Sequence, residues 1–333
     1  MARRILGMIV TAGVVAASAG QASAQKDLSR LRGDIKIDGS STVYPITEAV
    51  AEEFGEAAPR VRVTVGISGT GGGFKRFIVG ETDISDASRP IKDKEYKAAM
   101  DEGVGFIEIP VAYDGLTIVI NKNNYWVDSL SVDELRKIFL DGTNVDRWNE
   151  VRSDWPDKPI QIFSPGTDSG TFDYFKEVVA EEEGSIRGDM SVSEDDNVLV
   201  RGVAGNEGAI GFFGAAYYFE NKDKLKSVPI VNDELGKPVS PTPETIENGE
   251  YAPFSRPVFI YVSAKSADRR EVEAFVNFYL ENAARLSEEV GYVRLPQVIY
   301  DRASKNFQNR KTGTHFLDKD MEKVKGPLPS VYK

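Results

Sequence analysis

The chain has 333 residues, 41% of them hydrophobic and 28% charged, which is globular composition with enough length for two lobes. It carries 41 Lys and Arg against 52 Asp and Glu, and this net charge of −11 argues against a broad nucleic-acid-binding surface. With no cysteine, the chain has no disulfides, thiolate zinc sites or cysteine nucleophiles. The single histidine, His315, excludes a multi-histidine metal centre.

The N-terminus has the pattern of a cleaved export signal. Arg3 and Arg4 precede an apolar run over residues 5–17, and Ala22-Ser23-Ala24 follows as an A-x-A cleavage pattern. A membrane anchor is the alternative, but the run is short for a bilayer span, and no later stretch reaches about 18 apolar residues. We therefore predict a signal peptide over residues 1–24 and a soluble, periplasmic mature protein without a lipid anchor.

Strand and helix patterns alternate along the chain from residue 34. Strands are expected around residues 35–37, 61–67, 116–120, 160–163 and 257–262, and helices around residues 46–54, 74–79, 131–139, 172–179 and 272–279. The alternation predicts an α/β fold with mainly parallel sheets. Residues 110–115 and 238–257 read as domain boundaries, and the charged tail after Ala303 predicts loose packing.

Four loops share one chemistry: a strand ends, a segment rich in Gly, Ser and Thr follows, and a helix begins. They cover residues 38–42, 68–73, 85–90 and 164–171. Free backbone N–H groups, hydroxyl donors and the positive end of a helix dipole suit a tetrahedral oxyanion. One such loop is usually an ordinary helix cap, but four together predict a shared anion site.

The spacing of the residues disfavours nucleotide-binding and calcium-binding sites. The glycine run at residues 69–73 fails both the P-loop and the dinucleotide-binding patterns, because Phe74 stands where each needs its last glycine. The acidic residues 194–196 lack calcium-loop spacing and are expected to cap a helix starting near Asn197. The aromatic pairs at residues 212–213 and 217–218 are expected in the core.

Together, these loops resemble a known family. Residues 37–45, 68–73, 83–91 and 168–172 are similar, in the same order, to the phosphate loops of the high-affinity phosphate-binding proteins of bacterial phosphate ABC transporters. The resemblance implies an α/β, type II periplasmic-binding-protein fold, with two lobes joined by two crossover segments and the ligand in the cleft. Lobe 1 would cover residues 33–112 plus 256–333, and lobe 2 residues 113–255.

The resemblance and the loop chemistry together predict the phosphate ligands. They are Ser40, Ser41, Thr42, Ser68, Ser88, Arg89, Asp114, Ser169, Gly170 and Thr171. Pro165 falls near the place of an arginine in better-known members, and Ser88 falls at the place of an aspartate. We therefore expect Arg89 to be the principal cation. Asp86, Asp114 and Asp168 are candidates for the carboxylate, and the position of Asp114 at the first crossover favours it.

The sequence thus predicts a monomeric protein that binds inorganic phosphate without metal or cofactor. Its expected partners are the membrane permease components of a phosphate ABC transporter, with no nucleic acid partner and no membrane insertion after signal removal. A binding protein for sulfate, molybdate or another oxyanion is the main alternative. A secreted phosphatase is disfavoured, because the chain lacks a histidine cluster, a cysteine and a P-loop.

Overall fold

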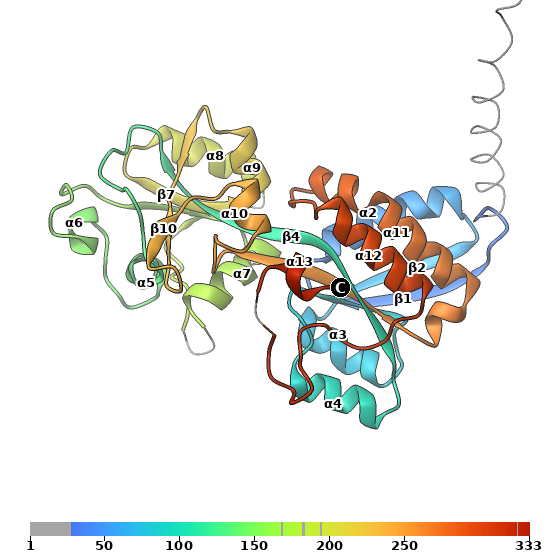
Figure 1. Cartoon of the computed structure of the whole chain (residues 1–333). Coiled ribbons are helices and arrows are strands. Elements are labelled where there is room, and N and C mark those ends of the chain that lie inside the picture. The colour runs from blue at the N-terminus through green and yellow to red at the C-terminus, as the bar shows by residue number, and fades with distance from the viewer. Residues whose placement is uncertain (1–27, 168, 182–183, 194, 325) are drawn as a thin grey trace, which may run out of the picture.

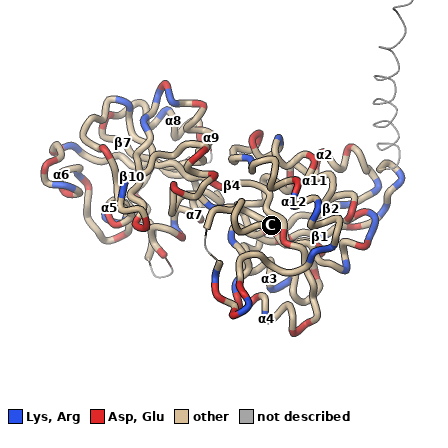
Figure 2. The backbone as a smooth tube through the Cα atoms, viewed as in Figure 1, with Lys and Arg blue, Asp and Glu red and all other residues tan. Residues whose placement is uncertain are grey.

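The structure is a computed structural model that describes residues 28–167, 169–181, 184–193, 195–324 and 326–333. The predicted signal peptide and Asp168 lie outside the described residues. Figure 1 shows two α/β parts joined by long strands. We call the part with β1–β3 lobe 1 and the part with β5–β7 lobe 2. No helix among the described residues is long and apolar enough to cross a membrane. In Figure 2 basic and acidic residues are interspersed along the backbone of both lobes.

A nine-stranded sheet runs through both lobes in the order β2-β1-β3-β11-β4-β7-β5-β6, and β8 also pairs with β4. A two-stranded ribbon, β9 with β10, is separate from it. The strands are β1 (Gly33–Gly39), β2 (Val61–Ile67), β3 (Ile84–Ala87), β4 (Phe106–Asn121), β5 (Gln161–Ser164), β6 (Ser191–Val192), β7 (Ala209–Gly214), β8 (Leu225–Ser227), β9 (Ile230–Asn232), β10 (Lys237–Val239) and β11 (Ser255–Ser263).

Helices cover both faces of this sheet, as the predicted α/β class requires. In lobe 1, α2, α11 and α12 lie on one side of β1–β3, and α3 and α4 lie on the other (Figure 1). The helices are α2 (Tyr44–Ala57), α3 (Gly69–Ile78), α4 (Asp93–Asp101), α5 (Val132–Phe139), α6 (Trp148–Val151), α7 (Gly170–Val179), α8 (Asp196–Gly205), α9 (Ala215–Glu220), α10 (Pro243–Glu247), α11 (Arg270–Glu289), α12 (Gln297–Gln308) and α13 (Leu328–Val331).

Two strands make the passage between the lobes. All sixteen residues of β4 are buried. Its residues up to Gly115 pair with β11, and from Leu116 onward it pairs with β7 and β8. Since β11 carries the chain back, it runs antiparallel to both β4 and β3. The expectation of mainly parallel sheets is therefore wrong: β1–β3 and β5–β7 pair in parallel, but every pairing of β4 and β11 is antiparallel.

Each lobe has an aromatic core where periodicity predicted apolar faces. In lobe 1, Phe54 of α2 meets Phe275 of α11 edge to face, with ring centres 5.3 Å apart. In lobe 2, Phe175 of α7 stacks on Phe212 of β7 at 3.9 Å. All four side chains are fully buried, and burying one such ring stabilises the fold by about 1.5–3 kcal/mol. These contacts fix α2 and α7, whose N-termini begin at two of the four loops.

Several local expectations change in the structure. The glycine run is not a loop, because α3 already begins at Gly69. Ile67, the last residue of the expected strand at residues 61–67, is 58% exposed. The tail after residue 303 is not loose: Tyr332 is fully buried and its hydroxyl donates to the Glu108 carbonyl at 3.0 Å. The expected cap is confirmed, since Asp195 accepts a hydrogen bond from Asn197 N–H.

Candidate functional site

The loop after β1 is shaped by a close approach to β3. Gly39 has φ +152°, and a Cβ there would lie 2.1 Å from the Asp86 carbonyl oxygen, so only glycine fits. The Ser40 N–H donates to that carbonyl at 3.0 Å, and the Ser40 hydroxyl accepts from Thr42 N–H at 3.2 Å. Ser40 and Thr42 are consequently fixed at the start of α2, both almost fully buried.

Thr70 and Ser88 come together beside this loop. Thr70 lies in the first turn of α3 and Ser88 directly follows β3, and their hydroxyls are 3.1 Å apart. The predicted ligand Ser68 is exposed, and its hydroxyl lies 2.7 Å from where a Cβ of Gly72 would be, back on its own helix. Thr70 was therefore missed by the sequence reasoning, although it stands inside the glycine-rich motif, and Ser68 stays a prediction.

Lobe 2 contributes the start of α7. Ser169 caps this helix by accepting from Thr171 N–H at 3.2 Å. The backbone of Gly170 rests on lobe 1, because a Cβ there would lie 2.6 Å from Thr42 Cα. The Thr42 hydroxyl also donates to the Gly170 carbonyl at 3.4 Å. The first and fourth predicted loops are thus in direct contact across the two lobes.

A buried ion pair lies where the two long strands run side by side. Arg256 of β11 is paired in register with Asp114 of β4, and its Nε is 3.3 Å from Asp114 Oδ2. Its Nη2 is 3.4 Å from the Thr42 hydroxyl, and its guanidinium carbon lies 3.6 Å above the centre of the Tyr174 ring. Burial raises the pKa of Asp114, against the opposing effect of Arg256. A cation and a carboxylate therefore lie together beside the first loop.

Arg89, the expected principal cation, has other partners. Its two terminal nitrogens each contact Glu95 at 2.8 Å, and its Nη1 also donates to the Pro90 carbonyl. Both terminal nitrogens of Arg89 are bound by Glu95, whereas Nη2 of Arg256 faces Thr42 of the first loop. This geometry favours Arg256 for the principal role, and Arg89 as a ligand stays a prediction. Sequence reasoning missed Arg256, although it is the penultimate residue of the second boundary segment, as Asp114 is of the first.

The three candidates for the phosphate-binding carboxylate differ in burial and position. Asp86 is fully buried, and burial raises its pKa to about 8, so its carboxyl keeps its proton near neutral pH and no anion can reach it from solvent. Asp168 lies outside the described residues. Asp114, 5% exposed and in contact with Arg256, is the candidate whose position fits.

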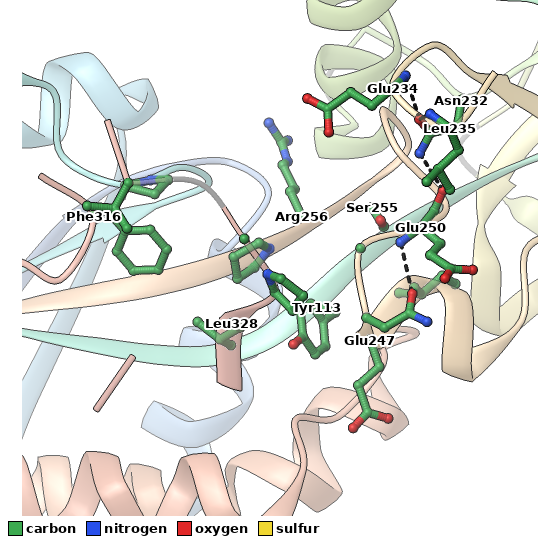
Figure 3. Close-up of a pocket in the computed structure, with 18 residues that line it drawn as sticks. Tyr113, Asn232, Glu234, Leu235, Glu247, Glu250, Ser255, Arg256, Phe316 and Leu328 are labelled. Atoms are coloured by element: carbon green, nitrogen blue, oxygen red, sulfur yellow. Dashed lines mark hydrogen bonds between the residues drawn. The ribbon is translucent and has the colours of Figure 1, made fainter. Parts of the chain in front are cut away.

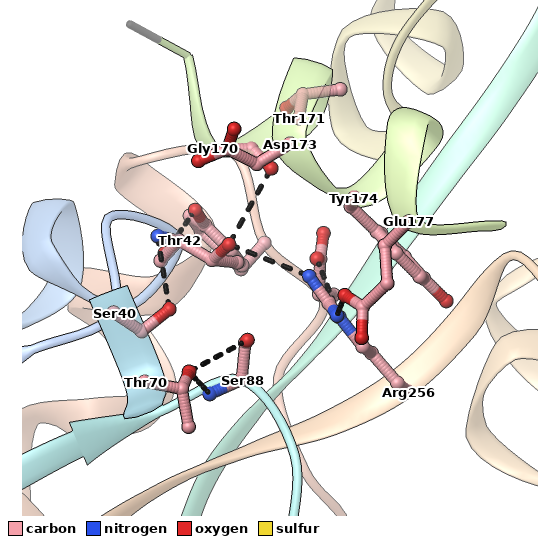
Figure 4. Close-up of polar contacts among 12 residues, drawn as sticks. Ser40, Thr42, Thr70, Ser88, Gly170, Thr171, Asp173, Tyr174, Glu177 and Arg256 are labelled. Carbon is pink, nitrogen blue, oxygen red and sulfur yellow. Dashed lines mark hydrogen bonds and ion pairs between the residues drawn. The ribbon is translucent and has the colours of Figure 1, made fainter. Parts of the chain in front are cut away.

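Figure 4 shows how these groups face one another: the hydroxyls of Ser40 and Ser88 and the guanidinium of Arg256 point to the same space beside Thr42. We call the interlobe cluster the set Ser40, Thr42, Thr70, Ser88, Asp114, Gly170 and Arg256. It combines hydroxyl donors, helix N-termini, one cation and one hydrogen-bond acceptor. A protonated oxyanion can bind to such a set of groups. Nowhere in the described ranges do three or more His, Asp or Glu gather so that they could hold a metal ion.

A cavity of about 450 Å³ adjoins the interlobe cluster, since Arg256 lines it (Figure 3). Tyr113 also lines this cavity. On the lobe 2 side its lining includes three carboxylates, those of Glu234, Glu247 and Glu250. Three carboxylates make this space unfavourable for an anion. The hydroxyl donors of the interlobe cluster therefore suit an oxyanion better than this cavity does.

The sequence matches a known family of binding proteins. A family sequence model described as a PBP superfamily domain matches residues 16–283. Protein SphX of Synechococcus elongatus is 50% identical over 94% of this chain and 90% of its own length. Phosphate-binding protein PstS of Staphylococcus haemolyticus is 41% identical over 89% of this chain and 92% of its own length.

A solved structure confirms the fold prediction. The crystal structure of a possible phosphate binding protein from Planctomyces limnophilus superposes with a TM-score of 0.82 at 46% identity, covering 84% of this chain and 99% of that one. The expected type II periplasmic-binding-protein fold is thereby confirmed, together with the family resemblance of the loops. The chain belongs to the PBP superfamily and, within it, to the family of the SphX and PstS phosphate-binding proteins.

Proposed function

We propose that the protein binds one inorganic phosphate ion between its two lobes and delivers it to the membrane permease of an ABC importer. The observation that carries this proposal is the interlobe cluster, in which the first loop of lobe 1 meets the start of α7 from lobe 2 beside a buried pair of Arg256 and Asp114. The names of the PstS relatives as phosphate-binding proteins support the same ligand. The importer partner is inferred from the family.

The interlobe cluster has enough donors for tight binding. Each hydrogen bond to a charged group contributes about 1.5–3 kcal/mol. Micromolar affinity requires about 8 kcal/mol, so four or five such bonds suffice after part is lost to ordering. The backbone N–H groups at the start of α3 and α7 add donors without side-chain entropy cost.

Asp114 supplies the preference for phosphate over sulfate. Phosphate near neutral pH keeps a proton on part of its population, because its second pKa is about 6 to 7. The Asp114 carboxylate can accept a hydrogen bond from that proton, whereas sulfate has none to offer and meets a repelling charge. Burial of Asp114 beside Arg256 strengthens both effects, since charges interact more strongly away from water.

We also infer that the protein is a carrier and not an enzyme, and that it works in the periplasm. The relatives are named as binding proteins, and the sequence has neither a cysteine nor a histidine cluster to activate a nucleophile. The predicted signal over residues 1–24 accounts for export. Mass spectrometry of the secreted protein tests it, with a mature N-terminus at Gln25 as the expected result.

Calorimetry with phosphate, sulfate and molybdate, on protein treated with EDTA, tests the proposed function. We expect one phosphate per chain with micromolar affinity or better, and sulfate binding weaker by about a hundredfold or more, since a repelling buried charge costs several kcal/mol. Tighter binding of sulfate or molybdate would assign another oxyanion. Loss of binding with EDTA would show a metal requirement, and release of phosphate from a generic ester would make the protein an enzyme.

A further inference from the structure

Helix α7 carries two acidic side chains that reach out of lobe 2. Asp173 and Glu177 are four residues apart and therefore lie on the same face of the helix. The same helix starts at Gly170, where lobe 2 touches lobe 1. The two carboxylates are thus placed along the line where the lobes meet.

Each of these carboxylates contacts a group outside lobe 2. The hydroxyl of Ser41, in the first loop of lobe 1, donates to Asp173 Oδ2 at 2.9 Å. The Nη1 of Arg256, at the start of β11, donates to Glu177 Oε2 at 2.7 Å. Figure 4 shows Glu177 and Tyr174 of α7 around the guanidinium of Arg256. The helix consequently holds both the loop of lobe 1 and the crossover strand.

We propose that Asp173 and Glu177 form a latch that stabilises the closed arrangement of the lobes and slows release of the bound anion. A contact made in only one of two conformations shifts their equilibrium toward that conformation. Opening the lobes moves Ser41 away from α7 and so breaks the contact with Asp173. The effect on release rests on the proposed function, but the effect on closure does not.

Glu177 has a second effect through the orientation of Arg256. It occupies Nη1, and Asp114 lies at Nε, so the Nη2 nitrogen is left toward Thr42 in the interlobe cluster. Glu177 is thereby a positioning residue, which acts on the anion through the arginine. It binds Nη1 and leaves Nη2 toward the interlobe cluster, so phosphate does not need to displace it.

Simple electrostatic repulsion by the two carboxylates would have the opposite effect on phosphate dissociation. Two carboxylates near an anion site repel the anion, and if they did nothing else, removing them would strengthen binding and slow dissociation. A latch instead predicts a more open unliganded protein and faster dissociation when the carboxylates are removed. The two readings therefore separate in one pair of measurements.

The experiment uses the double variant Asp173→Ala, Glu177→Ala, with Asp154→Ala as an exposed acidic control in the same lobe. Small-angle X-ray scattering without phosphate measures closure. We expect a larger radius of gyration for the double variant than for wild type and the control, and equal values for all three at saturating phosphate. Stopped-flow dissociation of phosphate should be about tenfold faster, given the ordinary strength of one hydrogen bond and one surface ion pair.

An unchanged radius without phosphate, together with equal or slower dissociation, would overturn the latch. Should the alanine variant fail to fold by circular dichroism, Asp173→Asn with Glu177→Gln repeats the test with smaller changes. The scattering comparison without phosphate stands even if the wild type proves to bind a different anion. Failure of the latch and failure of the proposed function are therefore distinguishable.

Discussion

Replacing Arg256 tests which cation neutralises the anion. The guanidinium is 14% exposed, lies against the Tyr174 ring at 3.6 Å and approaches the Thr42 hydroxyl at 3.4 Å, so its charge acts in a largely desolvated site. Truncating a buried, hydrogen-bonded charge costs about 2–5 kcal/mol, and Arg256→Ala should therefore weaken phosphate binding by about 30-fold to 5,000-fold. Arg256→Lys keeps the charge but loses the planar fork and the ring contact, and about tenfold to hundredfold weaker binding is expected.

Titration calorimetry of both variants measures these losses, with circular dichroism to show that the fold is intact. Arg89→Ala is the matched comparison, because Arg89 is also partly buried but has its guanidinium fork on Glu95. We expect it to lose clearly less affinity than Arg256→Ala. A larger loss in Arg89→Ala, or wild-type affinity in Arg256→Ala, would refute the assignment and return the principal role to Arg89.

Three further predictions concern closure, selectivity and stability. Gly170→Ala should weaken phosphate binding by about 1–3 kcal/mol in calorimetry, because its Cβ would lie 2.6 Å from Thr42 Cα, whereas Gly71→Ala, which meets open space, should not. Because burial raises the pKa of Asp114, its carboxyl is protonated at higher pH than usual and can then donate to sulfate, so the phosphate-to-sulfate affinity ratio should fall from pH 8 to pH 5 more steeply in wild type than in Asp114→Asn. The pKa of Asp86 is raised to about 8, so between about pH 4 and pH 8 its carboxyl keeps its proton in the folded state and loses it in the unfolded state. Rising pH in this range should therefore lower the free energy of unfolding of wild type, relative to Asp86→Asn, by up to about 1.4 kcal/mol per pH unit. Urea titrations in which the two proteins show the same dependence on pH would contradict this.

Sequence patterns were sufficient where the signal is local. The helix expected around residues 131–139 forms and begins with a capping box, in which Ser131 N–H donates to the Glu134 carboxylate and Glu134 N–H donates to the Ser131 hydroxyl. The apolar run at residues 116–120 is a buried strand, and the first and fourth loops meet as the shared chemistry suggested. Hydrophobic periodicity, caps and turn residues all act over a few residues, which is why they are readable in the chain.

What the sequence did not predict depends on tertiary contacts. Strand direction has no local signal, so the antiparallel pairing of β4 and β11 follows only from the return of the chain. Within α3, Gly73 packs against the end of β1, where a Cβ would lie 2.6 Å from Gly39 Cα, and this contact has no local pattern in the sequence. The partner of an arginine is likewise a tertiary choice: Arg89 has Glu95, and Arg256 has Asp114 from another strand.

The most direct test of the central claim is a crystal structure of the mature protein with phosphate. We expect a single phosphate between the lobes, within hydrogen-bond distance of the Ser40, Thr42 and Ser88 hydroxyls, the start of α7 and the guanidinium of Arg256. We also expect one phosphate oxygen facing Asp114. A phosphate bound elsewhere, such as in the cavity beside Tyr113, or one whose cation is Arg89 alone with Arg256 out of reach, would contradict the account.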